Sequence, residues 1–84
     1  QLKDWAHIVG GEMAALTQPQ RLHFPPGQQS GGTLTVLCAG AACVRLQYRT
    51  PYILEKLAVY FGYRAVTRVT IKQTHMQKPT GETT

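Results

Sequence analysis

Carboxylates are scarce in this chain: four Asp and Glu side chains stand against nine Lys and Arg side chains. The formal net charge is therefore +5, and the isoelectric point lies near 9.6. A basic balance of this size favours polyanionic partners, because clustered cations release counterions from phosphates. The alternative is a charge that keeps the protein in solution and binds no partner; composition alone does not separate the two.

Pairs of catalytic side chains are also missing. Asp4, Glu12 and Glu55 are single carboxylates in helical segments, and none has an evident second member for acid–base chemistry. The chain has no Ser-His-Asp order, no nucleophile elbow and no phosphate-binding glycine loop. Gly31 and Gly32 precede a strand, whereas such a loop follows a strand and opens a helix. We therefore expect a protein that is not an enzyme and that uses no cofactor.

Cysteines and potential metal ligands are few. Cys38 and Cys43 are the only cysteines, with four residues between them, and no secretory leader is recognised. We therefore expect free thiols in the cytoplasm. A metal site would need two further ligands, and the three His residues are scattered over unrelated segments. No apolar run approaches the ~20 residues of a membrane span, so neither a metal nor a membrane is expected.

What the chain does contain is the pattern of one small folded domain. Hydrophobic residues make up 43% of its 84 residues and charged residues 15%, which is enough for a thin core. Apolar residues recur at helical spacing from Leu2 to Leu16, which predicts a helix in spite of the Gly10-Gly11 pair. Trp5 lies on its apolar side and is expected to anchor the core. The chain begins without a Met, which is consistent with a piece of a longer protein.

Three alternating segments predict strands. They are Gln20–Phe24, Thr33–Ala39 and Ala65–Gln73. An exposed polar connector, residues 25–32, joins the first two. The folded domain is expected to span residues 1–73, and the polar residues 74–84 are expected to form a disordered tail or a linker.

The segment Ala41–Phe61, between the second and third strands, is helical but contains a proline. Pro51 lacks a backbone donor, and Thr50 before it is a good N-cap, so two helices that meet at Thr50 are predicted. Gly62 is placed to cap the second helix. The expected fold is α+β, in the order α-β-β-α-α-β, with a three-stranded sheet that carries its helices on one face.

Cations and tyrosines gather on two predicted surfaces. The open face of the sheet is expected to carry His23, Thr33, Thr35 and Thr70 together with the cations Arg21, Arg68 and Lys72. One face of the central helical region is expected to present Arg45, Tyr48, Arg49, Tyr52 and Lys56. The cations of both sets are predicted to contact phosphates, and the tyrosines to stack on unpaired bases. For the two tyrosines, a half-buried position at the edge of the core is an equal alternative.

The ordered landmarks of the chain resemble the DciA family. They are Trp5-x-x-Ile8-Val9-Gly10, Gly32-x-Leu34-x-Val36, Leu46, the Leu54/Leu57 helix, Tyr60-Phe61-Gly62 and Val69-x-Ile71. The resemblance covers about residues 2–73, and the segments 21–25 and 62–66 are most similar to alphaproteobacterial members. It implies a fold like that of K-homology (KH) domains. It also implies a cytoplasmic, nucleoid-associated protein that recruits or loads the bacterial replicative helicase DnaB onto single-stranded or forked DNA, without an ATPase of its own.

The chain departs from the family pattern in two places. Family members often carry a Trp and a Glu early in the central helical region, where this chain has Ala42 and Arg45. The joint at residues 49–52 also lacks the Gly-x-x-Gly loop with which a true KH domain clamps nucleotide backbone. Nucleic-acid binding through the usual KH groove is therefore not implied.

Two other functions compete with helicase loading. The order of elements and the charge also fit a KH-like RNA-binding or ribosome-associated module. A protein-interaction domain is the third hypothesis, because Leu37 is apolar on the outer face of its strand, close to the glycine-rich connector. Such a strand can recruit a partner or a second copy, so a homo-oligomer is also a hypothesis.

Overall fold

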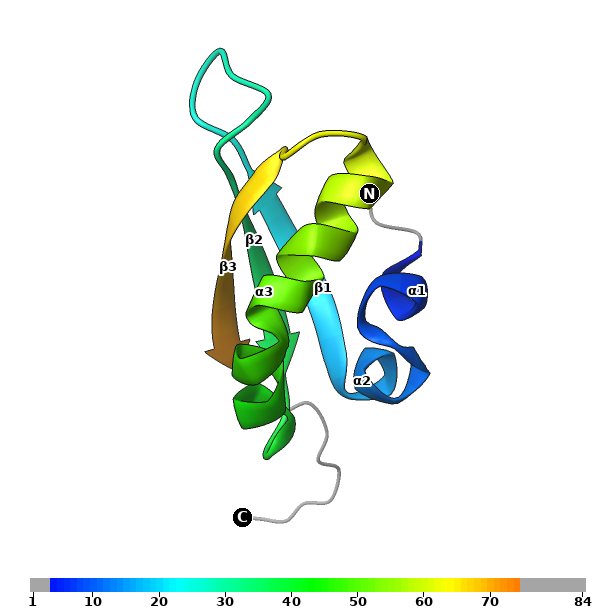
Figure 1. Cartoon of the computed structure of the whole chain (residues 1–84). Helices are drawn as coiled ribbons and strands as arrows, with labels where there is room; N and C mark the ends of the chain where they lie inside the picture. The colour runs from blue at the N-terminus through cyan, green and yellow to red at the C-terminus, as the bar shows by residue number, and fades with distance from the viewer. Residues whose placement is uncertain (1–3, 75–84) are drawn as a thin grey trace.

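The computed structural model describes residues 4–74, and its helices and strands follow the order α1-α2-β1-β2-α3-β3 (Figure 1). The elements are α1 (Trp5–Val9), α2 (Gly11–Leu16), β1 (Thr17–His23), β2 (Gly32–Cys38), α3 (Ala42–Phe61) and β3 (Val66–Gln73). The α+β class with a three-stranded sheet is confirmed. The helices divide differently from the prediction, because the break lies near the N-terminus and the central helix is continuous. Within the predicted tail, residues 75–84 lie outside the described part.

The predicted helix over Leu2–Leu16, of which residues 2–3 lie outside the described part, is interrupted at Gly10. This residue has a φ of 93°, which side chains with a Cβ rarely adopt. Its N–H donates to the carbonyl of Ala6 at 2.8 Å, which closes α1, and its carbonyl accepts from the N–H of Ala14 at 2.9 Å within α2. The glycine thus ends one short helix and starts the next.

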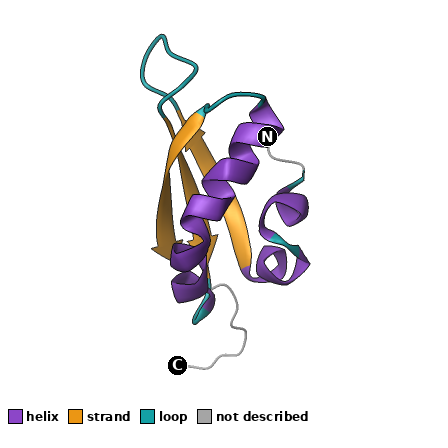
Figure 2. Cartoon of the chain, in the orientation of Figure 1, coloured by secondary structure: helices purple, strands orange, loops and turns teal. Residues whose placement is uncertain are grey.

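The sheet is mixed, with β2 at its centre. β1 pairs with β2 in antiparallel register, and β3 pairs with β2 in parallel register. A parallel pair needs a crossover connection, and α3 supplies it. Figure 2 shows α3 crossing the viewer's side of the sheet, with α1 and α2 beside it. The predicted placement of the helices on one face is confirmed.

The first predicted strand, Gln20–Phe24, is observed as β1, which begins earlier, at Thr17, and runs through Pro19. Because β1 is an edge strand, a residue without a backbone N–H is tolerated there. The register shifts between Pro19 and Arg21, so Gln20 forms a bulge. This bulge decides which side chains of β1 face the helices.

Gly32 starts β2 at a point where no side chain fits. A Cβ there would lie 2.6 Å from Cε1 of Phe24 and 3.0 Å from the carbonyl oxygen of Ala65. The N–H of Gly32 donates to that same carbonyl at 2.8 Å. The glycine of the Gly-x-Leu-x-Val motif therefore lets the end of the crossover approach the central strand.

α3 is one helix, so the predicted joint at Thr50 is wrong. Pro51 lies inside it on the exposed side, where the carbonyl that loses its partner is open to water. Leu46 and Ile53 are fully buried on either side of the proline and hold both halves on the sheet. Thr50 is not an N-cap; its hydroxyl donates to the carbonyl of Leu46 at 3.1 Å.

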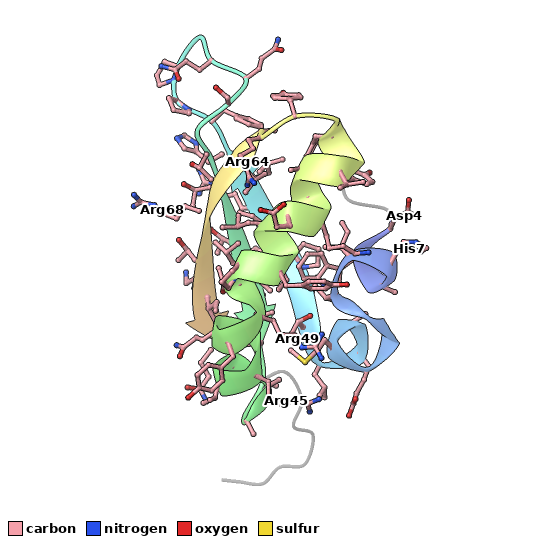
Figure 3. All side chains as sticks on the ribbon, in the orientation of Figure 1. Asp4, His7, Arg45, Arg49, Arg64 and Arg68 are labelled. Atoms are coloured by element: carbon pink, nitrogen blue, oxygen red, sulfur yellow. A yellow bond between two sulfur atoms is a disulfide. The ribbon has the colours of Figure 1, made fainter. Side chains whose placement is uncertain are left out.

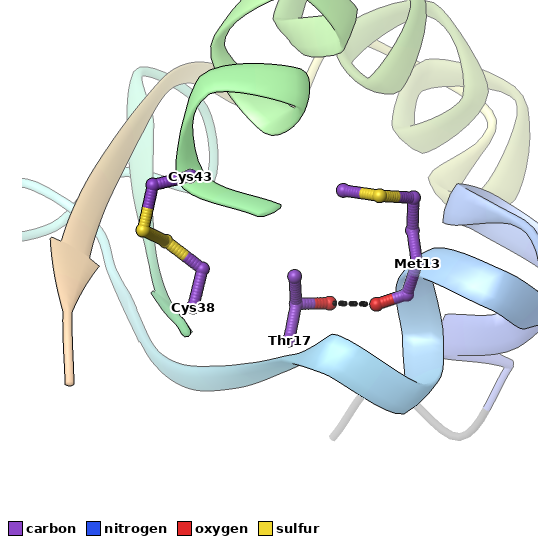
Figure 4. The surroundings of a disulfide bond; sticks show 4 residues. All are labelled: Met13, Thr17, Cys38 and Cys43. Carbon is purple, nitrogen blue, oxygen red and sulfur yellow. Dashed lines mark hydrogen bonds between the residues drawn. A yellow bond between two sulfur atoms is a disulfide. The ribbon is translucent and has the colours of Figure 1, made fainter. Parts of the chain in front are cut away.

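The core lies between the helices and the inner face of the sheet. Its largest fully buried side chains come from β2 and α3, among them Leu34, Leu46 and Leu57. Trp5 is buried as predicted, and its indole N–H donates to the hydroxyl of Thr17 at 3.0 Å. That hydroxyl donates in turn to the carbonyl of Met13 at 2.7 Å (Figure 4). The only buried polar residue among those described is therefore satisfied at the α2–β1 junction.

The two cysteines form a disulfide, which corrects the prediction of free thiols (Figure 4). Cys38 is the last residue of β2, and Cys43 lies in the first turn of α3. The turn at Gly40 reverses the chain between them and leaves the two Cα atoms 5.4 Å apart, a separation that suits a disulfide. The spacing alone did not reveal this, because the separation depends on the turn.

Candidate nucleic-acid interface

Three rows of side chains cross the outer face of the sheet, from β1 through β2 to β3. Paired residues of neighbouring strands point to the same face, opposite the buried Leu34, Val36 and Cys38. The rows are His23-Thr33-Arg68, Arg21-Thr35-Thr70 and Gln18-Leu37-Lys72. The predicted open face is thus assembled from all its members, and the third row adds Gln18 and Leu37.

The bulge in β1 is what turns Arg21 outward. With strict alternation from Thr17, which faces the core, Arg21 would also face the core and Leu22 would face water. The extra residue Gln20 shifts the pattern, so that Leu22 pairs with Leu34 on the inner face and Arg21 pairs with Thr35 on the outer face. Arg21 is exposed and Leu22 is half-buried, as this register requires.

The outer face of the sheet carries no carboxylate among residues 4–74. The acidic residues of this range all belong to the helical layer: Asp4 precedes α1, Glu12 lies in α2 and Glu55 in α3. Arg21 and Lys72, like Arg68, therefore have no ion-pair partner in the described part of the chain. Together with three threonine hydroxyls they form a surface that can bind phosphates.

The helical members of the predicted site lie on a different surface. Figure 3 shows Arg68 beside β3, whereas Arg45 and Arg49 project from the other layer, on the side of α2. Arg45 is partly neutralised, because its Nη2 lies 3.4 Å from Oε1 of Glu12. The ammonium of Lys56 lies 5.7 Å from the ring centroid of Tyr52, within the range of a cation–π contact.

The two tyrosines predicted on the central helix are exposed. Tyr48 has 82% and Tyr52 has 53% of its surface exposed, so neither ring is an edge of the core. The structure therefore brings Arg45, Tyr48, Arg49, Tyr52 and Lys56 to one side of α3 and the sheet cations to the opposite side of the molecule. It does not bring the two sets together.

Two tyrosines near the end of α3 contact neighbouring residues from exposed positions. Tyr63 is exposed, and its hydroxyl donates to the carbonyl of Gln29 at 2.7 Å, which ties the connector before β2 to the end of α3. Tyr60 is also exposed in part and meets Phe61 edge to face, with the ring centroids 5.1 Å apart. Sequence reasoning missed Val44 and Val59, which are exposed on α3, although their helical spacing from the tyrosines would have placed them there.

Other kinds of site are not found in the described residues. No group of three or more His, Cys, Asp or Glu side chains within residues 4–74 is arranged to hold a metal ion. Of the helices described, none is long and apolar enough to cross a membrane. A depression of about 180 Å³ lies between α1 and α3 and is lined by Asp4, His7, Ile8, Lys56, Val59 and Tyr60.

The comparison with protein families decides the identity of this domain. The family described as "Dna[CI] antecedent, DciA" matches residues 1–71. The chain belongs to the DciA family. Curated proteins include no matching relative. Membership confirms the resemblance read from the landmarks, and it implies a DnaB-loading factor in replication initiation that interacts with the helicase and is not an enzyme.

Proposed function

We propose that this DciA-family domain holds DNA on the outer face of its sheet while it loads the replicative helicase. Phosphates are bound by Arg21, Arg68 and Lys72, and the threonines between them donate hydroxyl hydrogen bonds. The observation that carries the proposal is the charge of this face. Its cations come from two strands on either side of β2, and no described carboxylate shares the face with them.

The sheet is a better DNA surface than α3 for an electrostatic reason. On α3, Arg45 forms an ion pair with Glu12, and the carboxylate of Glu55 is exposed. A phosphate approaching the helix would meet cations beside carboxylates, whereas the described sheet face carries cations and no carboxylate. Binding of nucleic acid by the helical residues remains a prediction, and the experiment below decides between the two surfaces.

The experiment compares two triple charge reversals in the full chain. The sheet variant is Arg21→Glu, Arg68→Glu and Lys72→Glu, and the matched control is Arg45→Glu, Arg49→Glu and Lys56→Glu on α3. Both change the net charge equally, so a difference between them reports the position of the charges. Affinity for forked and single-stranded DNA is measured by fluorescence anisotropy over a range of salt, and circular dichroism checks the fold.

We expect the sheet variant to lose DNA affinity about tenfold or more. The slope of log K against log salt concentration is expected to become smaller in magnitude by about two to three, because three phosphate contacts are lost. The control is expected to lose much less. Equal losses in both variants would show that net charge and not the sheet decides, and a larger loss in the control would place DNA on α3. A strong preference of the parent protein for structured RNA over forked DNA would favour the RNA-binding alternative.

Four finer assignments belong to the same proposal. The folded unit that carries it spans residues 1–73. Resemblance of the segments 21–25 and 62–66 to alphaproteobacterial members supports that subtype. A protein that meets DNA and the helicase works in the cytoplasm, at the nucleoid. Self-association would use the open edge of β3 or the half-buried Leu37, and sedimentation equilibrium tests it.

A further inference from the structure

A stripe of large apolar side chains runs along the solvent side of α3. Val44, Tyr48, Tyr52 and Val59 are 54%, 82%, 53% and 80% exposed. At about 100° per residue, these positions fall within an arc of about 80° on the helix surface. They lie opposite Leu46, Ile53 and Leu57, which are buried against the sheet. We call these four residues the α3 ridge.

The fold itself gives no reason for the α3 ridge. α3 already buries its opposite stripe in the core, so the exposed positions need only helix-forming side chains. Valine and tyrosine are poorer helix formers than Lys, Glu, Gln or Ala, which would also be better solvated. A row of exposed apolar side chains that neither packing nor helix propensity requires marks a contact with another molecule.

The cations of α3 itself border the α3 ridge on one flank, and Arg64, which follows the helix, is paired with Glu55. Arg45, Arg49 and Lys56, the basic border, lie about 20° to 60° beyond its edge, toward α1 and α2. The other flank carries the neutral Gln47 and Pro51. On the basic side, near the end of the helix, the ridge adjoins the depression between α1 and α3, which Val59 and Lys56 also line. A complementary partner presents apolar side chains beside carboxylates.

Two other occupants fit this surface less well. A second copy in a two-fold antiparallel arrangement would set the two basic borders side by side, and in a parallel arrangement neither border would meet a carboxylate. Nucleic acid fits less well because the ridge itself is apolar apart from Glu55, whose carboxylate is paired with Arg64 at 2.6 Å, so the ridge offers a phosphate no unpaired cation.

We propose that the α3 ridge and its basic border are the docking surface for the replicative helicase. The contact on the helicase is an apolar patch flanked by Asp or Glu. The assignment deepens the loading role of the family and rests on the proposed function in one respect, that DNA occupies the opposite face. One domain would then hold DNA with its sheet and the helicase with its helix.

The test uses the full chain with Tyr48→Gln, Tyr52→Gln and Val59→Gln. All three positions are exposed and Gln is a good helix former, so the fold is expected to persist, as circular dichroism checks. Affinity for the DnaB hexamer is measured by biolayer interferometry, and affinity for forked DNA by anisotropy. We expect at least a tenfold loss for the helicase and less than a twofold change for DNA.

The sheet variant described above is the matched control, and it is expected to bind the helicase like the parent. A ridge variant that binds the helicase with the parent's affinity overturns the proposal. So does one that loses DNA affinity instead, which would assign the tyrosines to base stacking, or one that changes only the oligomeric state. The proposal for the DNA surface is tested separately, because it fails if the sheet variant keeps its DNA affinity.

The basic border gives a second, independent readout. The variant Arg45→Glu, Arg49→Glu and Lys56→Glu is expected to weaken helicase binding most at low salt, because screening removes the contribution of these charges at high salt. A loss of the same size at all salt concentrations, or no loss at all, would contradict carboxylates on the partner.

Discussion

At the scale of single residues, the Cys38–Cys43 disulfide fixes the junction between the central strand and the crossover helix. It closes a loop that is only five residues long by sequence separation. For such a loop the chain-entropy estimate of the stabilisation is roughly 2 kcal/mol. This is a useful contribution for a domain with a thin core, whose total stability is expected to be small.

The stability of the oxidised and reduced protein measures this contribution. Urea unfolding with and without a reductant is expected to differ by roughly 2 kcal/mol in favour of the oxidised form. The variant Cys38→Ala with Cys43→Ala serves as the control, because its midpoint does not respond to reductant. Identical midpoints for the oxidised and reduced parent, with two thiols open to alkylation, would restore the free thiols expected from sequence.

At the scale of elements, α3 is the structural centre of the domain and also carries a local defect. Pro51 removes one backbone donor from the middle of the helix and crowds the preceding turn. The helix continues because its buried stripe, including Leu46 and Ile53, gains more from packing than the proline costs. Sequence reasoning weighed only the local preference and therefore placed a joint there.

The change Pro51→Ala tests this balance. Restoring the donor in an exposed helix position is expected to stabilise the domain by roughly 1–2 kcal/mol, since the gain in the helix exceeds the freedom added to the unfolded chain. Calorimetry should show a rise in melting temperature of about 4–8 °C for each kcal/mol. Gln47→Ala, one turn earlier on the same exposed flank, is the control and is expected to change the midpoint little. A lower midpoint for Pro51→Ala would mean that the proline shapes α3 for packing.

At the scale of the whole molecule, the two candidate surfaces lie on opposite sides of a domain that consists of one sheet and one layer of helices. The charged residues of the sheet face are cations, and the α3 ridge is largely apolar with a basic border. Because the two surfaces share no residue, the two ligands would not compete for contacts under the proposed assignments. A single copy of the domain would then bridge DNA and helicase.

Independence of the two sites has a measurable consequence. A saturating concentration of helicase is expected to change the DNA affinity of the domain by less than about twofold, because separate rigid faces carry little coupling free energy. The ridge variant, measured with the same helicase concentration, is the control. The readout is the fluorescence anisotropy of labelled DNA. The anisotropy change that helicase causes without the domain is measured alone and subtracted. Mutual exclusion of the two ligands would show that both use one face.

The sequence by itself determined the three strands except for the start of the first, the burial of Trp5, the family, and the cations and tyrosines of the candidate surfaces, but not Val44 and Val59. These follow from alternation, helical spacing and residue chemistry, which are local properties. Tertiary structure decided the rest. The bulge at Gln20 turns Arg21 outward, the turn at Gly40 joins the cysteines, and packing carries α3 through Pro51. Tertiary structure also separates the sheet cations from the helix cations. Each element exposes the side that does not pack in the core, and which side packs is known only when the elements are assembled.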